Sequence, residues 1–296
     1  MFNIIEALRS PDIARLLPAI RKFEIGDLLF AHFTCPPTET WEASWAERDR
    51  LVHVATGHKT LRTATGVWDI GPGDTIFLKK GASFLRHSDP EELCLFMYFI
   101  PDDFVRMAVR EMASELRALP PPTDTRDSVV HVRNDVGVQA FLQAMTIFFA
   151  AADTPPELLL KLKLKELIAS IVLSPTNASL SSYLRMLARS DAPSLPAIME
   201  ENCCHNLSLE AFAKLCHRSL SAFKREFSQQ YGVAPGRWLL DRRLERSAQL
   251  LTTTNLSVTD IVFECGFEQP SHFSRAFKTK YGRTPSEYRD ARDAAA

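Results

Sequence analysis

The chain carries one sequence pattern twice in its last third. The stretch NLSLEAFAKLC begins at Asn206, and NLSVTDIVFEC begins at Asn255, 49 residues later. A second pair follows, AFKREFSQQYGVAPGRW from Ala222 and HFSRAFKTKYGRTPSEY from His272, with one more residue between the two blocks of the second copy. An internal repeat constrains a fold more than any local propensity, and two copies are too few for a solenoid. The chain therefore contains a duplicated module.

Each copy of the module predicts two helices joined by a short turn. In the first copy Ser208 is a good N-cap for an apolar helical stripe that ends at Cys216, and a second helix runs from about Ser219 to Gly232. The second copy has the same signals in sequence: the capping pattern Ser257 and Asp260, the helix breaker Gly266, the first-turn Pro270 and the terminal Gly282. Two such helices form a helix-turn-helix unit.

The second helix of each unit is predicted to bury one face and to expose a basic face. Aromatic residues recur every four positions and must point inward: Phe223, Phe227 and Tyr231 in the first copy, and Phe273, Phe277 and Tyr281 in the second. The opposite faces carry hydroxyl groups, Lys and Arg: Ser221, Lys224, Arg225, Ser228, Ser271, Ser274, Arg275 and Lys278. Arg can bind guanine through two hydrogen bonds, and hydroxyl groups can meet phosphates. A solvated helix face is the alternative, but an Arg repeated at one position favours DNA.

The segment PGRWLLDRRLERSAQLLTTT between the two units predicts a connecting helix of about 18 residues, or about 27 Å. A stiff spacer of this length suits two recognition helices in successive major grooves, which lie about 34 Å apart. Arg242, Arg243 and Arg246 load one side of this helix, where they can contact phosphates or pair with Asp241 and Glu245. Net charge is −1 for the whole chain, so composition permits nucleic-acid binding without demonstrating it.

Residues 193–292 resemble the DNA-binding domain of the AraC/XylS family of bacterial transcription regulators. The resemblance is carried by GFEQPSHFSRAFKTKYGRTPSEYR, from Gly266 to Arg289. It implies a transcription activator that binds promoter double-stranded DNA and works with RNA polymerase. It also implies that the positions predicted above contact bases or backbone, above all Ser221, Lys224, Arg225, Ser271 and Arg275. Pro270 departs from the family pattern, because some relatives have a polar DNA-contacting residue there.

Residues 1–101 predict a cupin-like β-barrel with a sensory or regulatory role. Short β-rich runs such as GDLLFAHF, LVHVATG and LCLFMYFI are separated by turn signals. The turn IGPGDTIFLKKG, from Ile70 to Gly81, resembles the Pro-Gly-Asp hairpin of cupin-like sensor barrels. The fold class is thus α+β: an N-terminal cupin-like barrel with a helical connector, and a C-terminal all-α domain of two helix-turn-helix units. The barrel is predicted to be a ligand pocket or a protein-docking surface.

Metal and enzyme chemistry find little support in the sequence. His53, His58 and His87 are scattered, with no HxH pair and no matching Glu, so we expect no metal and no other cofactor. The six cysteines form no CxxC pair, as is typical of a reducing cytosol. A cupin-type metal enzyme and an alkyl-repair regulator remain as alternatives, but the latter needs several zinc-binding cysteines near the N-terminus, where the sequence has Cys35 and Cys94. We expect a protein that is not an enzyme.

Residues 102–190 predict a helical connector. Its segment PPELLLKLKLKELIASIVL is apolar around most of its circumference, with Leu160, Leu164, Leu167 and Ile171 on one side. The surplus predicts a homodimer through residues 138–173, which a charge at Leu164 or Leu167 should weaken; a fully buried helix is the alternative. Pro193 and Pro196 are predicted to mark the linker to the DNA-binding domain.

The order of barrel, connector and paired units is similar to that of the family branch that activates type III secretion genes. This resemblance implies control by a protein anti-activator in place of a sugar. No apolar run has the length of a membrane span, and the N-terminus lacks the pattern of a secretory signal. We therefore expect a cytoplasmic protein with no membrane partner.

Overall fold

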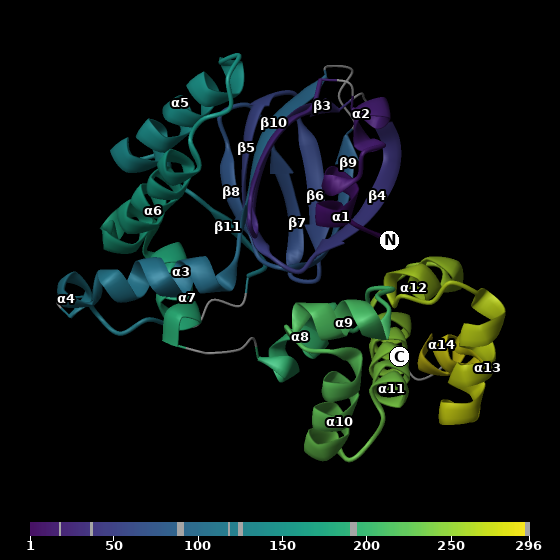
Figure 1. The fold of residues 1–296 in the computed structure, drawn as a ribbon. Coiled ribbons are helices and arrows are strands. Elements are labelled where there is room, and N and C mark those ends of the chain that lie inside the picture. Colours follow the sequence, from purple (N-terminus) through teal and green to yellow (C-terminus); the bar gives the residue numbers. More distant parts are fainter. Residues whose placement is uncertain are drawn as a thin grey trace. The chain divides into compact units, whose positions relative to one another are not determined.

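The computed structural model describes residues 1–17, 19–35, 38–87, 92–117, 119–123, 127–189 and 194–293. The chain divides into two compact units, Met1–Pro193 and Ser194–Ala296. The first unit is built of strands and helices and the second of helices alone, which confirms the α+β class (Figure 1). The domain boundary expected after residue 101 falls inside the first unit. Of the expected linker, Pro193 lies outside the described residues, and Pro196 lies in the first turn of a helix.

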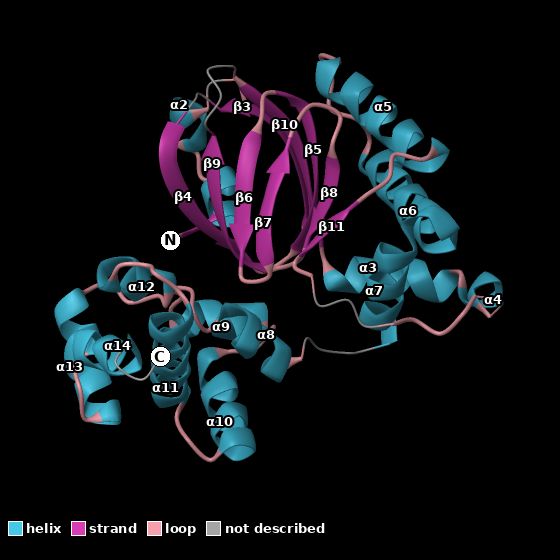
Figure 2. Ribbon diagram, turned by 180° about the vertical axis from the view of Figure 1, so that it is seen from behind, coloured by secondary structure: helices cyan, strands magenta, loops and turns pink. Residues whose placement is uncertain are grey.

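Two β-sheets form the centre of the first unit (Figure 2). The five-stranded sheet has the order β1 (Phe2–Asn3), β4 (Thr38–Ala46), β9 (Gly81–His87), β6 (Lys59–Thr63), β7 (Gly66–Ile70). The six-stranded sheet has the order β11 (Val129–His131), β8 (Thr75–Leu78), β5 (Asp49–Thr56), β10 (Leu93–Ile100), β3 (Leu28–Cys35), β2 (Arg21–Ile25). The described ladders are antiparallel apart from the parallel pair β1 and β4. Such facing antiparallel sheets are the arrangement expected of a cupin-like barrel.

Strand β10 shows why the unbroken apolar run LCLFMYFI forms a strand. Its side chains alternate between two cores because successive residues of a strand point to opposite faces. Leu95, Met97 and Phe99 pack into the core between the sheets, and Tyr98 and Ile100 pack into a second core outside the six-stranded sheet. A strand that is buried on both faces needs apolar residues at every position.

Helices cover the outer face of the six-stranded sheet (Figure 1). They are α3 (Asp102–Glu111), α5 (Val136–Ala150), α6 (Glu157–Leu173), the 3₁₀ turn η1 (Pro175–Asn177) and α7 (Ala178–Arg189), and the short helix α4 (Ala113–Leu116) follows α3 away from the sheet. Two short helices, α1 (Ile4–Arg9) and α2 (Ile13–Leu16), lie near the N-terminus, and Ile4, Ile5 and Leu8 join the core between the sheets.

The predicted stripe on α6 is the inner face of this helical layer. Leu160, Leu164 and Leu167 are fully buried in the core that α6 shares with the sheet. The expectation that a charge at Leu164 or Leu167 would test self-association is therefore wrong, because such a charge would disrupt the unit's own core. The apolar side chains that remain most exposed on α6 are those of Leu158 and Leu162, at 68% and 51%.

Buried polar contacts also tie the helices to the sheet. The Tyr183 hydroxyl on α7 donates to Asp49 Oδ2 on β5 at 2.7 Å, and Lys80 pairs with Asp102 of α3 at 2.5 Å. Burial raises the pKa of the Asp49 carboxyl, and the positive charge of Lys80 opposes that rise. The connector and the sheet are thus parts of one folded unit.

The second unit consists of seven helices within its described residues, 194–293. They are α8 (Leu195–Asn202), α9 (Leu209–Leu215), α10 (Leu220–Tyr231), α11 (Pro235–Thr253), α12 (Val258–Glu264), α13 (Pro270–Tyr281) and α14 (Pro285–Asp293). Helices α9 and α10 form the first helix-turn-helix unit, and α12 and α13 form the second. The 19-residue helix α11 joins them, close to the predicted length.

Candidate nucleic-acid interface

The two helix-turn-helix units share their end signals, as the repeat predicts. The side chains of Ser208 and Ser257 cap α9 and α12 by accepting from the backbone N–H three residues on. Both second helices end on a left-handed glycine, Gly232 with φ of 70° and Gly282 with φ of 73°. These caps fix where α10 and α13 begin and end, and so fix which side chains they expose.

The turns between the helices adopt the same backbone shape in both units. Gly266 turns the chain with φ of 76°, and His217, at the equivalent place in the first unit, has φ of 54°. The next residue in each unit donates its N–H to the carbonyl five residues back, Arg218 to Ala213 at 2.9 Å and Phe267 to Val262 at 3.0 Å. A left-handed conformation is rare for a residue other than glycine. The first helix-turn-helix unit therefore keeps the shape of the turn at a cost in backbone strain at His217.

The inward faces are also built alike. Phe223, Phe227, Phe273 and Phe277 are fully buried as predicted, whereas Tyr231 and Tyr281, the last members of the predicted stripes, are half-buried. Phe227 meets Trp238 edge-to-face with ring centres 5.8 Å apart, and Phe277 meets Tyr288 in the same way at 5.3 Å. Aromatic pairs of this geometry add to the burial of apolar surface, so each second helix is held firmly against its unit.

The outward faces hold the eight side chains that were predicted to contact DNA. Ser274 is half-buried, and the others are exposed: Ser221, Lys224, Arg225, Ser228, Ser271, Arg275 and Lys278. Arg225 and Arg275 occupy the same position, two residues after the first buried Phe of their helices. Among the described residues, neither guanidinium makes a hydrogen bond or an ion pair with another side chain. Both groups are therefore available to a partner.

Two lysines lie on the same faces near carboxylates of their own units. Hydrogen bonds at the start of α9 lower the pKa of Glu210, and Lys224 adds to that shift. Hydrogen bonds with Thr284 lower the pKa of Glu287 in the second unit, and Lys278 adds to it. These carboxylates are fully exposed, so the lysine charges are screened by water and are not neutralised in fixed pairs.

Arg243 on α11 has a structural role that the sequence did not reveal. Its guanidinium donates to the carbonyls of Cys203 at 2.7 Å, His205 at 2.8 Å and Gly266 at 3.1 Å. It thereby joins the loop after α8 to the turn of the second helix-turn-helix unit. Among the predicted basic residues of α11, Arg242 pairs with Glu200 and Glu245, and Arg246 donates to Gln249. Arg242, Arg243 and Arg246, which were expected to contact phosphates, thus have partners within the domain.

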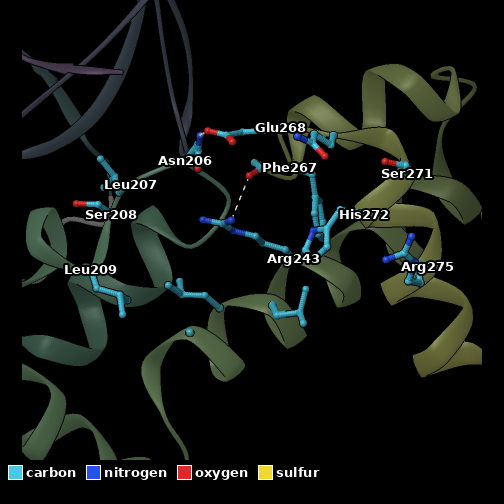
Figure 3. A pocket seen from close by; sticks show the side chains of 15 residues that line it. Asn206, Leu207, Ser208, Leu209, Arg243, Phe267, Glu268, Ser271, His272 and Arg275 are labelled. Carbon is cyan, nitrogen blue, oxygen red and sulfur yellow. Dashed lines mark hydrogen bonds between the residues drawn. The ribbon is translucent and has the colours of Figure 1, made fainter.

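A hollow of about 690 Å³ lies beside Arg243 in the second unit (Figure 3). The start of α9 lines one side of it with Ser208 and Leu209, and α13 lines another with Ser271, His272 and Arg275. The dashed line in Figure 3 marks the hydrogen bond that Arg243 donates to the carbonyl oxygen of Gly266. The hollow thus brings residues of both helix-turn-helix units to one surface. Ser271 and Arg275, two of the predicted DNA contacts, are among them.

No arrangement suited to a metal ion occurs in the described part of the chain. There, no three His, Cys, Asp or Glu side chains are grouped so that they could hold one. His53, one of the three scattered histidines of the sequence, forms a 2.9 Å hydrogen bond with Thr75, and burial lowers its pKa. The described helices include none that is long and apolar enough to cross a membrane.

Comparison with known proteins agrees with both units. Residues 212–291 match a family described as a helix-turn-helix domain, and residues 49–183 match the ExsA N-terminal regulatory domain. The virulence regulon transcriptional activator VirF of Yersinia enterocolitica is 26% identical over 82% of this chain and 89% of its own length. The HTH-type transcriptional regulator ExsA of Pseudomonas aeruginosa is 24% identical over 88% of this chain and 92% of its own length.

The chain is similar to AraC-type transcription regulators in both matched segments. It combines an AraC-type DNA-binding domain with an N-terminal regulatory domain of the ExsA type. Among solved structures, ToxT of Vibrio cholerae is 15% identical over 88% of this chain and 97% of its own, with a TM-score of 0.37. The relatives are transcription regulators, and they give no support to the metal-enzyme and alkyl-repair alternatives.

Proposed function

We propose that the chain activates transcription by placing α10 and α13 in successive major grooves of promoter DNA. The observation that carries this proposal is the matched pair of arginines, Arg225 and Arg275, presented in one register by two units with the same caps and turns. The 19 residues of α11 span about 28 Å, near the 34 Å between successive major grooves. Each arginine would bind one guanine, and the serines and lysines beside it would contact phosphates or bases.

Alanine at each arginine tests this proposal. Arg275→Ala should weaken binding to the best promoter sequence by about 1–3 kcal/mol and relax preference at one base pair. Arg225→Ala should do the same about 10 base pairs away. Arg15→Ala, which removes an exposed arginine from the N-terminal unit, is the matched control for net charge and should bind as wild type. If both recognition-helix variants lose affinity equally for all sequences, the arginines contact only phosphates.

Self-association is the second part of the proposal. Apolar side chains remain exposed on neighbouring helices of the connector, with Ile147 on α5 at 65%, Leu158 on α6 at 68% and Leu162 on α6 at 51%. Water contact of this kind is unfavourable for large apolar groups, and a second copy of the chain would cover them. We therefore retain the homodimer through residues 138–173, with exposed residues replacing Leu164 and Leu167 as its contacts.

The target genes and the protein partners are also proposals. VirF is by name an activator of a virulence regulon. We propose that this chain likewise acts on virulence genes, those for type III secretion among them, in the cytoplasm and together with RNA polymerase. Control by an anti-activator that binds the N-terminal unit belongs to the same proposal, which assigns the chain no catalytic step.

One observation favours a small ligand as a further means of control. A cavity of about 500 Å³ lies in the N-terminal unit, and apolar side chains line most of it, among them Phe33 and Met97. Lys59 also lines it, although that side chain is only 5% exposed. Burial lowers the pKa of Lys59 to about 8, and Cys35 and Glu42, which line the same cavity, oppose that fall. An anion with an apolar tail would satisfy both the charge and the cavity.

Direct binding measurements would test the ligand proposal. A set of carboxylates with growing hydrocarbon chains should bind the full-length chain with affinity that rises with chain length. Lys59→Met should leave the cavity in place, and its affinity for a ligand should no longer depend on the carboxylate group. Equal binding of the matching alcohols by wild type would show that Lys59 does not select an anion.

A further inference from the structure

Three of the six cysteines gather where the loop after α8 meets the second helix-turn-helix unit. Cys203 ends α8, and its Sγ lies 3.8 Å from that of Cys204. Both side chains are half-buried, so small oxidants can reach them from solvent. Cys265, at the end of α12, is fully buried, and it is close enough to raise the pKa of Cys204 and to have its own pKa raised by Cys203. All six cysteines of the chain are free thiols.

The two adjacent thiols have different electrostatic surroundings. The hydrogen bond between them lowers the pKa of Cys204 and raises that of Cys203, and the charges of Arg246 and Arg243 also lower the pKa of Cys204. Burial opposes the lowering at Cys204. A pair that consists of one thiolate-prone sulfur and one thiol is the arrangement in which the first sulfur reacts and the second resolves the product.

We propose that Cys203 and Cys204 form a reversible disulfide in response to hydroperoxides. The Cys204 thiolate attacks one oxygen of the peroxide, so that an S–O bond forms, the O–O bond breaks, and the other oxygen leaves with a proton as water or alcohol. The Cys203 thiol then attacks the resulting sulfenic acid, forms the S–S bond and releases water. The dithiol loses two electrons, which the peroxide gains, and an external dithiol can reverse the reaction.

Disulfide formation here must distort the backbone. Neighbouring Cα atoms are about 3.8 Å apart, whereas disulfides ordinarily join Cα atoms about 4.4–6.8 Å apart. The backbone at this point is held on several sides: Arg243 binds the carbonyls of Cys203 and His205, and the Cys204 carbonyl packs against Gly266, where an added Cβ would lie 2.5 Å from its oxygen. A rotation of the peptide between the two cysteines therefore also moves Gly266 and the turn that precedes α13.

The expected result is a DNA-binding domain that loses affinity when oxidised. The Arg243 contacts position Gly266 relative to the loop after α8, and Gly266 leads into the helix that carries Arg275. A strained disulfide is also easily reduced, which suits a reversible response and not a structural bond. The effect on DNA rests on the proposed role of α13, whereas formation of the disulfide does not.

The test uses the full-length chain treated with hydrogen peroxide and then with a thiol-alkylating reagent. Mass spectrometry should show a loss of two hydrogens and two fewer alkylated cysteines, with the linked sulfurs in the single peptide that contains Cys203 and Cys204. Affinity for promoter DNA should fall by about tenfold, or about 1.4 kcal/mol, and dithiothreitol should restore it.

Serine variants separate this proposal from its alternatives. Cys203→Ser and Cys204→Ser should bind DNA normally before treatment and should lose the tenfold response, and Cys94→Ser, in the other unit, should keep it. Six alkylated cysteines after peroxide, a disulfide to Cys265, or an unchanged affinity once the disulfide has formed would each overturn the proposal. Failure of the reduced wild type to prefer any promoter sequence would instead overturn the proposed function, and the mass measurement would still stand.

Discussion

The duplicated turn allows a prediction in which one unit serves as the control for the other. His217 and Gly266 hold the same left-handed place, with φ of 54° and 76°. A residue other than glycine pays about 1–2 kcal/mol for this conformation, and a glycine loses about 0.4–1 kcal/mol in extra chain entropy. His217→Gly should therefore be more stable than His217→Ala by about 0.5–1 kcal/mol. Both variants lack the imidazole, so their difference reports the backbone alone.

The opposite change in the second unit should be severe. At Gly266 an added Cβ would lie 2.5 Å from the Cys204 carbonyl oxygen, which is backbone that Arg243 anchors on both sides. Strain of about 1–2 kcal/mol and overpacking of about 1–3 kcal/mol together exceed the entropy gained, so Gly266→Ala should destabilise the unit by about 2–4 kcal/mol.

Thermal and denaturant unfolding of the full-length variants would measure these differences. In a domain of this size 1 kcal/mol shifts the melting temperature by about 4–8 °C. The C-terminal domain of His217→Gly should therefore melt slightly above that of His217→Ala. The C-terminal domain of Gly266→Ala should melt at least about 8 °C below that of wild type. If Gly266→Ala has the melting temperature of wild type, or if His217→Gly melts at a lower temperature than His217→Ala, the two turns do not share the strained geometry. The structural equivalence of the two helix-turn-helix units is then refuted.

Three further predictions address the core, the dimer and the cavity. Phe277→Ala should cost about 3–5 kcal/mol of unfolding free energy, measured by denaturant titration, because the ring is fully buried. Leu162→Asp should leave the melting temperature near that of wild type and raise the dimer dissociation constant in analytical ultracentrifugation; wild type that stays monomeric with DNA present would contradict the dimer. Lys59→Met should stabilise the ligand-free chain at pH 7, since the fall in the Lys59 pKa from 10.5 to about 8 corresponds to roughly 3 kcal/mol. The stability of wild type should approach that of Lys59→Met as pH rises from about 8 to 10.5, because in this range the unfolded lysine holds a proton that the folded lysine has lost. A difference in stability that does not change with pH would argue against a buried charge.

The features that sequence predicted well are those that a local period or cap determines. Phe223 and Arg225 lie on opposite faces of α10 because 3.6 residues per turn leaves no other choice for an aromatic stripe. The same reasoning located the glycine ends of α10 and α13. It located the apolar strand β10 as well, where a continuous hydrophobic run met clear turn signals.

The features that sequence missed depend on partners far along the chain. Arg243 looks like its exposed neighbours Arg242 and Arg246, and only the fold brings three carbonyls to it. Strand β4 was missed because TETWEASWA is weakly apolar and gains its place by pairing with β9. The left-handed turn at His217 has no glycine to mark it. For α6, periodicity found the stripe but could not distinguish a core of the same chain from the surface of a second copy.

Methylation interference on promoter DNA would show whether α10 and α13 enter the major groove, since a methyl group on N7 of guanine blocks an arginine there. Wild type should give two clusters of interfering guanines about 10 base pairs apart. Arg275→Ala should lose one interfering guanine from one cluster, and Arg225→Ala should lose one from the other. A single cluster, or a pattern that neither substitution changes, would contradict the placement of α10 and α13 in successive major grooves.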